Sequence, residues 1–247
     1  MRNLYRSIKT IARVGLLTPL LTIFPLGHLA AQDPFEFTEN FDNFDPSRFQ
    51  TKIPNKNTRI RNGVLWTHGE SGGKYPPMVH LDLSALEIKG EKHEYKDLEI
   101  SFRYRYLQPG SMIWFFLDGD DGYGSVDHLL RVKLLPTGVQ LQIDSHTLDA
   151  NHPDRQNKDR PADKISAAFR LSQKLPKVLV ELKTSQWHDV KVVFRSNTAA
   201  ISVDDDAYSQ TLRHNCFNTT KRKMLWMQKS GDEGIEIDDV VIRNTTK

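Results

Sequence analysis

Hydrophobic and polar residues alternate most regularly in two segments, Asp97–Leu107 and Trp187–Asp206. From Leu98 to Tyr106 every second residue is apolar or aromatic, and the residues between are charged or serine. The second segment contains two such runs on either side of the polar sequence Ser196-Asn197-Thr198, which is typical of a β-hairpin. A period of two residues predicts strands that bury one face and expose the other.

Two further segments, Met112–Leu117 and Met224–Gln228, are apolar at nearly every position. This pattern predicts central strands that are covered on both faces, or covered on one face with an aromatic floor on the other. The segments His128–Leu135 and Val139–Asp144 alternate again and flank the turn sequence Pro136-Thr137-Gly138. We predict a second hairpin there.

The segment Gly234–Arg243 changes phase, since Ile235 and Ile237 share one parity while Val240 and Ile242 share the other. One extra residue at Asp238-Asp239 would restore the inward direction, which predicts a β-bulge. Ten or more short strands separated by turns predict an all-β fold, a two-sheet antiparallel sandwich. The first and last strands should lie near each other, because the ends of a compact domain are often close.

One part of the chain departs from the strand pattern, at about Ala150–Ser185. We interpret it as an insertion between strands. Within it, Ala162–Leu175 is bounded by Pro161 and Pro176 and has a weak apolar stripe, which predicts one short helix. A single helix among many strands does not change the fold class.

The N-terminus has the succession of a secretory signal peptide. Met1–Arg13 carries four basic residues and no acid, Val14–Gly27 is apolar, and the small residues Ala30 and Ala31 follow. The apolar run is shorter than the roughly 20 residues of a membrane span. We expect cleavage after Ala31, a secreted or periplasmic single domain at 32–247, and no stable membrane insertion afterwards.

Removal of this segment changes the charge balance. The whole chain has a net charge of +3, and four of its basic residues lie in the expected signal peptide, which leaves about −1. A chain near neutrality lacks the positive charge that nucleic-acid binding requires, so no nucleic-acid partner is predicted. The single cysteine, Cys216, excludes an internal disulfide, so the core must hold the fold.

Three motifs resemble the concanavalin A-like jelly-roll superfamily: W-H-x-V-x-V at Trp187, I-x-V-D at Ile201, and I-D-D-V-V-I-R at Ile237. This superfamily includes laminin G-like modules and secreted bacterial domains of the 3-keto-disaccharide hydrolase and glycoside hydrolase family 16 types. The resemblance implies a jelly-roll sandwich of two curved antiparallel sheets, with ligands on the concave face or at the strand-end loops.

The catalytic motifs of these families match less well. The family 16 motif Glu-x-Asp-x-x-Glu has its nearest counterpart at Glu236–Val241, where the last position is a valine. A retaining glycosidase needs two carboxyls about 5 Å apart, and a valine cannot supply one. The mid-sheet Asn-Ser-Gly segment of the keto-disaccharide group corresponds to Gly110-Ser111-Met112, which also departs from the motif.

The polar faces of three predicted strands supply residues for one ligand-binding patch. Sugar sites combine planar hydrogen-bonding groups with an aromatic floor. The candidate ligand-binding residues are Glu99, Arg103, Arg105, Trp114, Arg131, Gln142 and Asp144. The alternative is an ordinary solvated sheet face with weak cross-strand ion pairs.

Two further kinds of chemistry have candidate residues. Asp144 with His128 or His146 could act as acid and base if these side chains converge, or they could be polar residues at a sheet rim. Acidic loops could hold a structural calcium ion, with Asp118, Asp120 and Asp238 as candidate ligands, or they could form turns. We predict no required cofactor.

These observations leave three hypotheses. The main one is an exported domain that binds a carbohydrate or glycan without cutting it. The second is a glycoside hydrolase of the 3-keto-disaccharide type. The third is an interaction module of the cell envelope, with the insertion at Ala150–Ser185 as its docking surface.

Overall fold

The computed structural model describes residues 35–69, 76–88, 90–120, 126–146, 170–205 and 207–245. The chain divides into two compact units, Met1–Gln32 and Asp33–Lys247, and all described residues belong to the second. The predicted signal peptide, the predicted cleavage point and most of the predicted insertion therefore lie outside the described residues.

Two antiparallel sheets make up the described unit. The eight-stranded sheet has the order β14-β13-β12-β7-β16-β3-β2, with β1 added beside β16. Its strands are β1 (Glu36–Glu39), β2 (Thr58–Arg61), β3 (Val64–Thr67), β7 (Leu98–Tyr106), β12 (His188–Arg195), β13 (Thr198–Val203), β14 (Tyr208–Arg213) and β16 (Ile235–Asn244).

The second sheet has six strands in the order β11-β10-β9-β8-β15-β4. Its strands are β4 (Met78–Asp82), β8 (Met112–Asp120), β9 (Val126–Leu135), β10 (Gly138–His146), β11 (Arg170–Lys174) and β15 (Lys221–Ser230). A separate small ribbon pairs β5 (Glu87–Ile88) with β6 (Glu91–Lys92).

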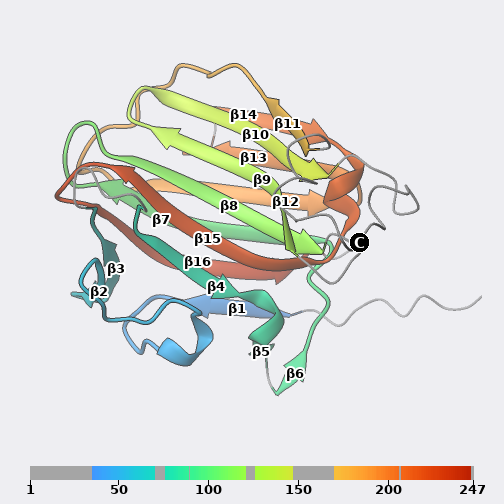
Figure 1. Cartoon of the computed structure of the whole chain (residues 1–247), viewed down its shortest axis with the longest axis horizontal. Helices are drawn as coiled ribbons and strands as arrows, with labels where there is room; N and C mark the ends of the chain where they lie inside the picture. Colours follow the sequence, from blue (N-terminus) through green and yellow to red (C-terminus); the bar gives the residue numbers. More distant parts are fainter. Residues whose placement is uncertain are drawn as a thin grey trace, which may run out of the picture. The chain divides into compact units, whose positions relative to one another are not determined.

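The core lies between the two sheets, which are stacked as layers (Figure 1). From β7 the residues at even positions point inward, and from β8 those at odd positions do. The ring of Phe102 lies 5.0 Å from that of Phe115 and 5.6 Å from that of Trp226, so the inner faces interlock. The predicted two-sheet antiparallel sandwich is confirmed.

The closing strand also follows the prediction. The register between β16 and β7 shifts between Asp238 and Val241, and Asp239 has a φ of 47°. Such a bulge lets Ile237 and Val240 both point inward, although their spacing is odd. On its other edge β16 pairs with β1, which places the first and last strands side by side.

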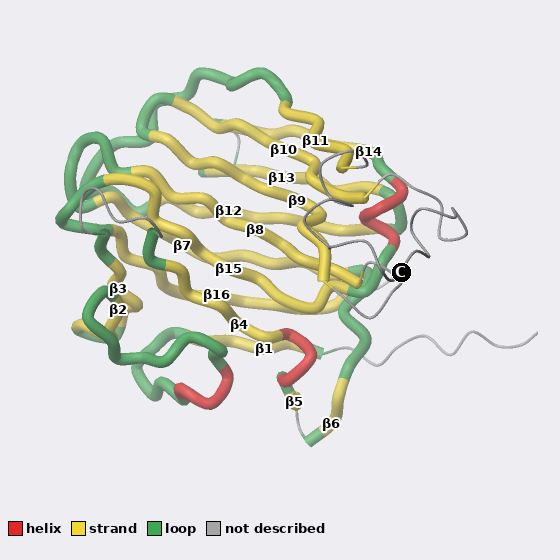
Figure 2. Tube along the Cα trace, viewed as in Figure 1, coloured by secondary structure: helices red, strands yellow, loops and turns green. Residues whose placement is uncertain are grey.

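The predicted helix is wrong where it can be compared. Of the expected span Ala162–Leu175, the segment Arg170–Lys174 forms β11, an edge strand paired with β10, and residues 162–169 lie outside the described residues. The helices that are described are three short 3-10 turns at Pro46–Arg48, Leu83–Ala85 and Asn215–Asn218 (Figure 2). The edge of β10 offers backbone hydrogen-bond partners to Arg170–Lys174, and this pairing outweighs the weak helical preference of the segment.

In the described part of the chain, no helix has the length and apolar character needed to cross a membrane.

Candidate ligand-binding face

The predicted ligand-binding residues do not form one patch. Glu99, Arg103 and Arg105 lie on β7 and point outward from the eight-stranded sheet, whereas Trp114 and Arg131 point outward from the six-stranded sheet. The inward residues of β7 and β8 pack against each other, so these two outer faces look in opposite directions. The single-patch prediction is wrong because alternation shows which side chains point outward, but not to which sheet a strand belongs.

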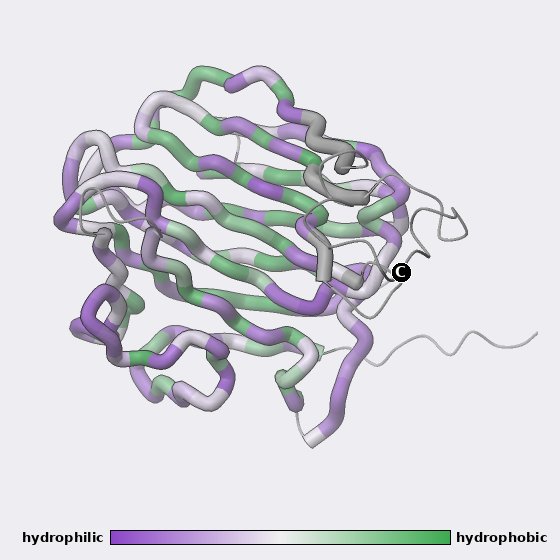
Figure 3. The backbone as a smooth tube through the Cα atoms, in the orientation of Figure 1, coloured by the Kyte–Doolittle hydropathy of each residue, from purple (hydrophilic) through white to green (hydrophobic). Residues whose placement is uncertain are grey.

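The outer face of the six-stranded sheet brings several of the candidates together. Figure 3 shows hydrophilic and hydrophobic positions alternating along β9 and β10, as a half-buried sheet requires. The cross-strand register sets Trp114 opposite Lys133, Phe116 opposite Arg131, and Arg131 opposite Gln142. We call this surface the Trp114 face; its described side chains include Met78, His80, Asp82, Trp114, Phe116, Asp118, His128, Arg131, Lys133, Gln140, Gln142, Lys223, Leu225, Met227 and Lys229.

Trp114 is the half-buried aromatic ring of this face. Three cationic groups surround it: the Arg131 guanidinium carbon at 5.2 Å, the Lys133 Nζ at 4.8 Å and the Lys229 Nζ at 4.7 Å from the ring centroid. Arg131 also donates from Nη1 to Oε1 of Gln142 at 3.2 Å. An aromatic ring and two planar hydrogen-bonding groups are therefore neighbours.

Phe116 has a different role from Trp114. It is only 2% exposed, because the Arg131 guanidinium covers its ring at 4.6 Å and the His128 ring lies 5.2 Å away. Polar side chains therefore cover the ring of Phe116, whereas part of the Trp114 ring remains exposed.

An Asp–His pair lies at the other end of the face. Nδ1 of His128 is 2.6 Å from Oδ1 of Asp118, and the Asp118 carboxylate is buried while the His128 side chain is 33% exposed. The register between β8 and β9 shifts after Leu117, and this shift sets His128 opposite Asp118. A carboxylate on Nδ1 fixes the orientation of the ring and leaves Nε2 as its second hydrogen-bonding nitrogen.

His80 lies on the same face as this pair, on β4, and β15 runs between it and Asp118 of β8. Burial lowers its pKa, and the Lys223 ammonium lowers the pKa further, while the Asp118 carboxylate acts in the opposite sense. His80 is therefore neutral at neutral pH and can accept a proton. Sequence reasoning missed the contact of Asp118 with His128, because it depends on a register shift, and missed His80, because the place of β4 beside β15 cannot be read from the pattern.

The remaining catalytic candidates cannot be judged in the same way. Asp144 and His146 lie on β10, opposite Ser172 and Arg170 of β11, but their side chains lie outside the described residues. The described partner of His128 is Asp118 rather than Asp144. Catalytic roles for Asp144 and His146 stay predictions.

The calcium candidates lie apart. Asp118 binds His128 on the Trp114 face, whereas Asp238 lies on the opposite outer face, where Arg103 donates to it at 2.6 Å. Asp120 ends β8, and its side chain is outside the described residues. Among the side chains that the structure describes, no group of three or more His, Cys, Asp or Glu could hold a metal ion.

The outer face of the eight-stranded sheet is an ion-pair network. Arg105 pairs with Glu236, and Arg103 pairs with Asp238 and, at 3.0 Å, with Asp239. The ring of Trp187 packs against both arginines, 4.7 Å from each guanidinium carbon. The acids of the family 16-like string are thus held by arginines.

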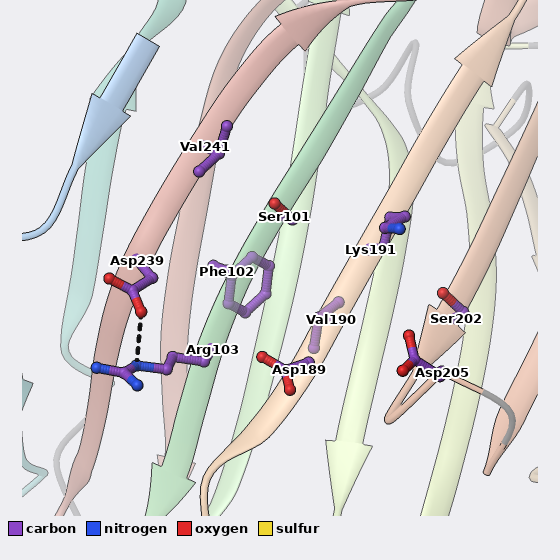
Figure 4. A pocket seen from close by; sticks show the side chains of 10 residues that line it. All are labelled: Ser101, Phe102, Arg103, Asp189, Val190, Lys191, Ser202, Asp205, Asp239 and Val241. Atoms are coloured by element: carbon purple, nitrogen blue, oxygen red, sulfur yellow. Dashed lines mark ion pairs between the residues drawn. The ribbon is translucent and has the colours of Figure 1, made fainter. Parts of the chain in front are cut away.

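A cleft of about 320 Å³ lies beside this network, over β7 and β12. Figure 4 shows Arg103 and Asp239 turned toward each other at one side of it, and Lys191 at another. Its polar lining also includes Ser101, Asp189, Ser202 and Asp205.

Comparison with known proteins shows the fold. No family model and no curated protein sequence matches the chain. Porphyranase B from Zobellia galactanivorans superposes with a TM-score of 0.59 at 9% identity, covering 91% of this chain and 98% of that one. A glycoside hydrolase family 16 endo-glucanase from Bacteroides ovatus gives 0.53 at 15% identity, covering 83% and 99%. The fold is a concanavalin A-like jelly roll.

A third jelly-roll match is the CBM2 module of the evolved Dit of Lactobacillus casei BL23 phage J-1. It has a TM-score of 0.54 at 9% identity and covers 87% of this chain and 98% of that one. Because all three identities are low, the similarity establishes the jelly roll and leaves the activity to be argued from the side chains.

Proposed function

We propose that this jelly roll is an exported carbohydrate-binding domain that holds a glycan on the Trp114 face without cleaving it. The observation that carries the proposal is the half-buried ring of Trp114 beside the Arg131 guanidinium and the Gln142 amide. An aromatic face packs against the apolar side of a sugar ring, and planar polar groups bind its hydroxyls. Two of the similar structures, a porphyranase and an endo-glucanase, are named for action on glycans.

Among the side chains that the structure describes, the positions of the carboxylates favour binding over hydrolysis. Glu236 and Asp238 are held by arginines on the opposite outer face. Asp118, at the end of the Trp114 face away from Trp114, is held by His128. A retaining glycosidase requires two carboxyl groups about 5 Å apart with room for a sugar between them.

The test compares two tryptophans, one on each outer face. Trp114→Ala should weaken retardation in polysaccharide-containing gels by about tenfold or more, because a central aromatic contact is lost. Trp187→Ala, the matched control on the opposite face, should bind like the unchanged protein. The proposal fails if no polysaccharide retards the protein, or if both variants bind equally well.

Acid–base catalysis is the second candidate function, and the Asp118–His128 pair is the observation that favours it. An imidazole oriented by a carboxylate beside the neutral His80 could move a proton at a bound sugar. Reducing ends released by the protein but not by His128→Gln, with glycan binding retained, would replace the binding proposal by a catalytic one. Under the proposal itself, prolonged incubation releases no product.

Export is part of the proposal and rests on the N-terminal sequence. Expression in a bacterium should give a mature protein that begins at Gln32, as measured by N-terminal sequencing and intact mass. A full-length protein retained in the cytoplasm would contradict export and leave the binding proposal untouched.

A further inference from the structure

Apolar side chains form a row across one side of the Trp114 face. Met227 of β15 lies directly opposite Trp114 of β8 and, on its other side, directly opposite Met78 of β4. We call these three residues the methionine row, and all three are half-buried. The outward positions of a sheet that faces water are usually polar. Half-exposed apolar side chains on three adjacent strands therefore offer a surface that an apolar group can cover.

Met112 adds a third thioether beside the ring. It lies two residues before Trp114 on β8, and its Sδ accepts a hydrogen bond from Nε1 of Trp114 at 3.0 Å. This bond uses the single polar atom of the indole, so the exposed part of the ring offers a ligand only apolar surface. The chain has five methionines; Met1 belongs to the expected signal peptide and Met224 is buried in the core, so the other three all lie in the methionine row or next to it.

The opposite side of Trp114 is polar. Lys133 of β9 lies opposite Trp114, and Gln140 of β10 lies opposite Lys133. A sugar ring on Trp114 therefore meets polar side chains toward β9 and methionines toward β15. A hydroxyl placed on the methionines would lose its contacts with water without gaining a hydrogen bond, whereas a methyl group there would gain from leaving water.

We infer that the bound glycan carries methyl-bearing substituents, O-acetyl or O-methyl groups, which lie on Met227 and Met78 while a sugar ring packs on Trp114. This inference rests on the proposed function and specifies its ligand class. Methionine suits such a role because its unbranched, polarisable side chain adapts to small apolar groups. An acetyl ester and a methyl ether present the same methyl group to the row, so the experiment separates them.

The experiment compares three forms of one polymer in affinity gels: the O-acetylated form, the alkali-deacetylated form, and the deacetylated form after O-methylation to the same degree. The polymers are xylan, glucomannan and the polysaccharide that most retards the unchanged protein. The protein variants are Met227→Gln, Met227→Leu, Trp114→Ala and the control Val241→Gln. Val241 is, like Met227, a half-buried apolar strand residue, but it lies on β16 beside the cleft of the opposite face.

The inference predicts that at least one substituted polymer binds about fivefold or more tightly than its unsubstituted form. Met227→Gln has a side chain of similar length but polar, and it should lose most of this preference while binding the unsubstituted form as before. Met227→Leu should keep the preference, because the side chain stays apolar. Trp114→Ala should bind every form more weakly, and Val241→Gln should bind like the unchanged protein. Whether the acetylated or the methylated form binds better assigns the substituent.

Three outcomes overturn the inference in distinguishable ways. Equal binding of substituted and unsubstituted forms contradicts the methyl-bearing ligand and leaves glycan binding intact. A preference that survives in Met227→Gln, or that falls equally in Val241→Gln, shows that the methionine row is not its source. The absence of binding to every polymer in every form removes the inference together with the proposed function.

Discussion

The two outer faces of the sandwich carry similar side chains, but these side chains have different roles: ion pairing on one face and, as we propose, ligand binding on the other. Each has a half-buried tryptophan beside cationic side chains, Trp114 on one face and Trp187 on the other. On the eight-stranded sheet the arginines are paired with carboxylates, which makes the cluster a cross-strand brace. On the six-stranded sheet the cations surround a ring that keeps part of its surface exposed, and we propose that a glycan packs on this ring.

A second tryptophan on the eight-stranded sheet extends this contrast. Trp66 is only 7% exposed, packs between Arg59 and Arg61, and donates from Nε1 to the backbone oxygen of Glu233. The rest of the protein therefore covers nearly the whole ring of Trp66, which leaves little surface for a ligand. A tryptophan on an outer strand face is therefore not by itself a ligand-binding ring, and the exposure of the ring is the more informative feature.

Lys221 is a cation in a third environment, the buried interior, and its removal should have the largest effect on the free energy of unfolding. Lys221 is buried, donates from Nζ to the backbone oxygens of Lys96 and Phe217, and lies 4.5 Å from the centre of the Phe194 ring. Burial lowers its pKa from 10.5 to about 8, against the opposing effect of Asp97. Between these values the unfolded chain binds more protons than the folded one, so stability rises with pH.

The contribution of Lys221 to the free energy of unfolding, measured as the difference between the protein and Lys221→Met, should therefore increase by about 2 kcal/mol from pH 8 to pH 10. Four buried tyrosines, Tyr95, Tyr104, Tyr106 and Tyr208, have pKa values that burial raises, and they act in the opposite sense as the pH approaches and passes 10, equally in the protein and in a Lys221 variant. Urea unfolding of the protein and of Lys221→Met at several pH values measures this rise. An equally steep rise in the variant would show that Lys221 is not its source.

The paired tryptophan variants should separate stability from binding. Trp187→Ala removes the ring that packs against Arg103 and Arg105, and we expect a loss of about 1–2 kcal/mol in stability with binding retained. Trp114→Ala should lose binding at a smaller cost in stability. Urea unfolding and affinity gels on both variants measure the two effects, and the reverse assignment would invert the roles of the two faces.

Charge removal should have unequal costs on the two faces. Asp238→Asn leaves the half-exposed Arg103 with Asp239 alone, and we expect a loss of about 1 kcal/mol in unfolding free energy. Lys229→Gln should leave stability unchanged. Thermal unfolding of both variants is the measurement, and a lower midpoint for Lys229→Gln would mean that its charge braces the fold.

Calcium removal should have the smallest effect. The carboxylates of Asp118 and Asp238 already bind His128 and Arg103. We therefore expect a chelator to change neither the thermal midpoint nor glycan binding. A midpoint that rises on addition of calcium would point to a calcium site instead.

Hydrophobic alternation was sufficient to predict most of the fold. The pattern of Asp97–Leu107 gave the inward and outward residues of β7 correctly, and the phase change at Asp238-Asp239 gave the bulge in β16. Both follow from local geometry, since a strand turns every second side chain to the same side. The segment Met112–Leu117, apolar on both faces, forms β8 between two neighbouring strands.

Features that depend on distant pairing could not be predicted. The sequence does not tell which sheet receives β7 and which receives β9, so Arg103 and Arg131 were expected together and lie on opposite faces. The Asp118–His128 contact requires a register shift between two strands. Arg170–Lys174 becomes a strand because β10 offers it a free edge.

The central claim is that glycan binds the Trp114 face, and tryptophan oxidation tests it most directly. The chain has four tryptophans; Trp66 and Trp226 are buried, while Trp114 and Trp187 are half-buried on opposite faces. Mild oxidation followed by peptide mass spectrometry, with and without the polysaccharide that binds most tightly, reports on both faces in one sample. The account predicts protection of Trp114 and unchanged oxidation of Trp187; protection of Trp187 alone would contradict it.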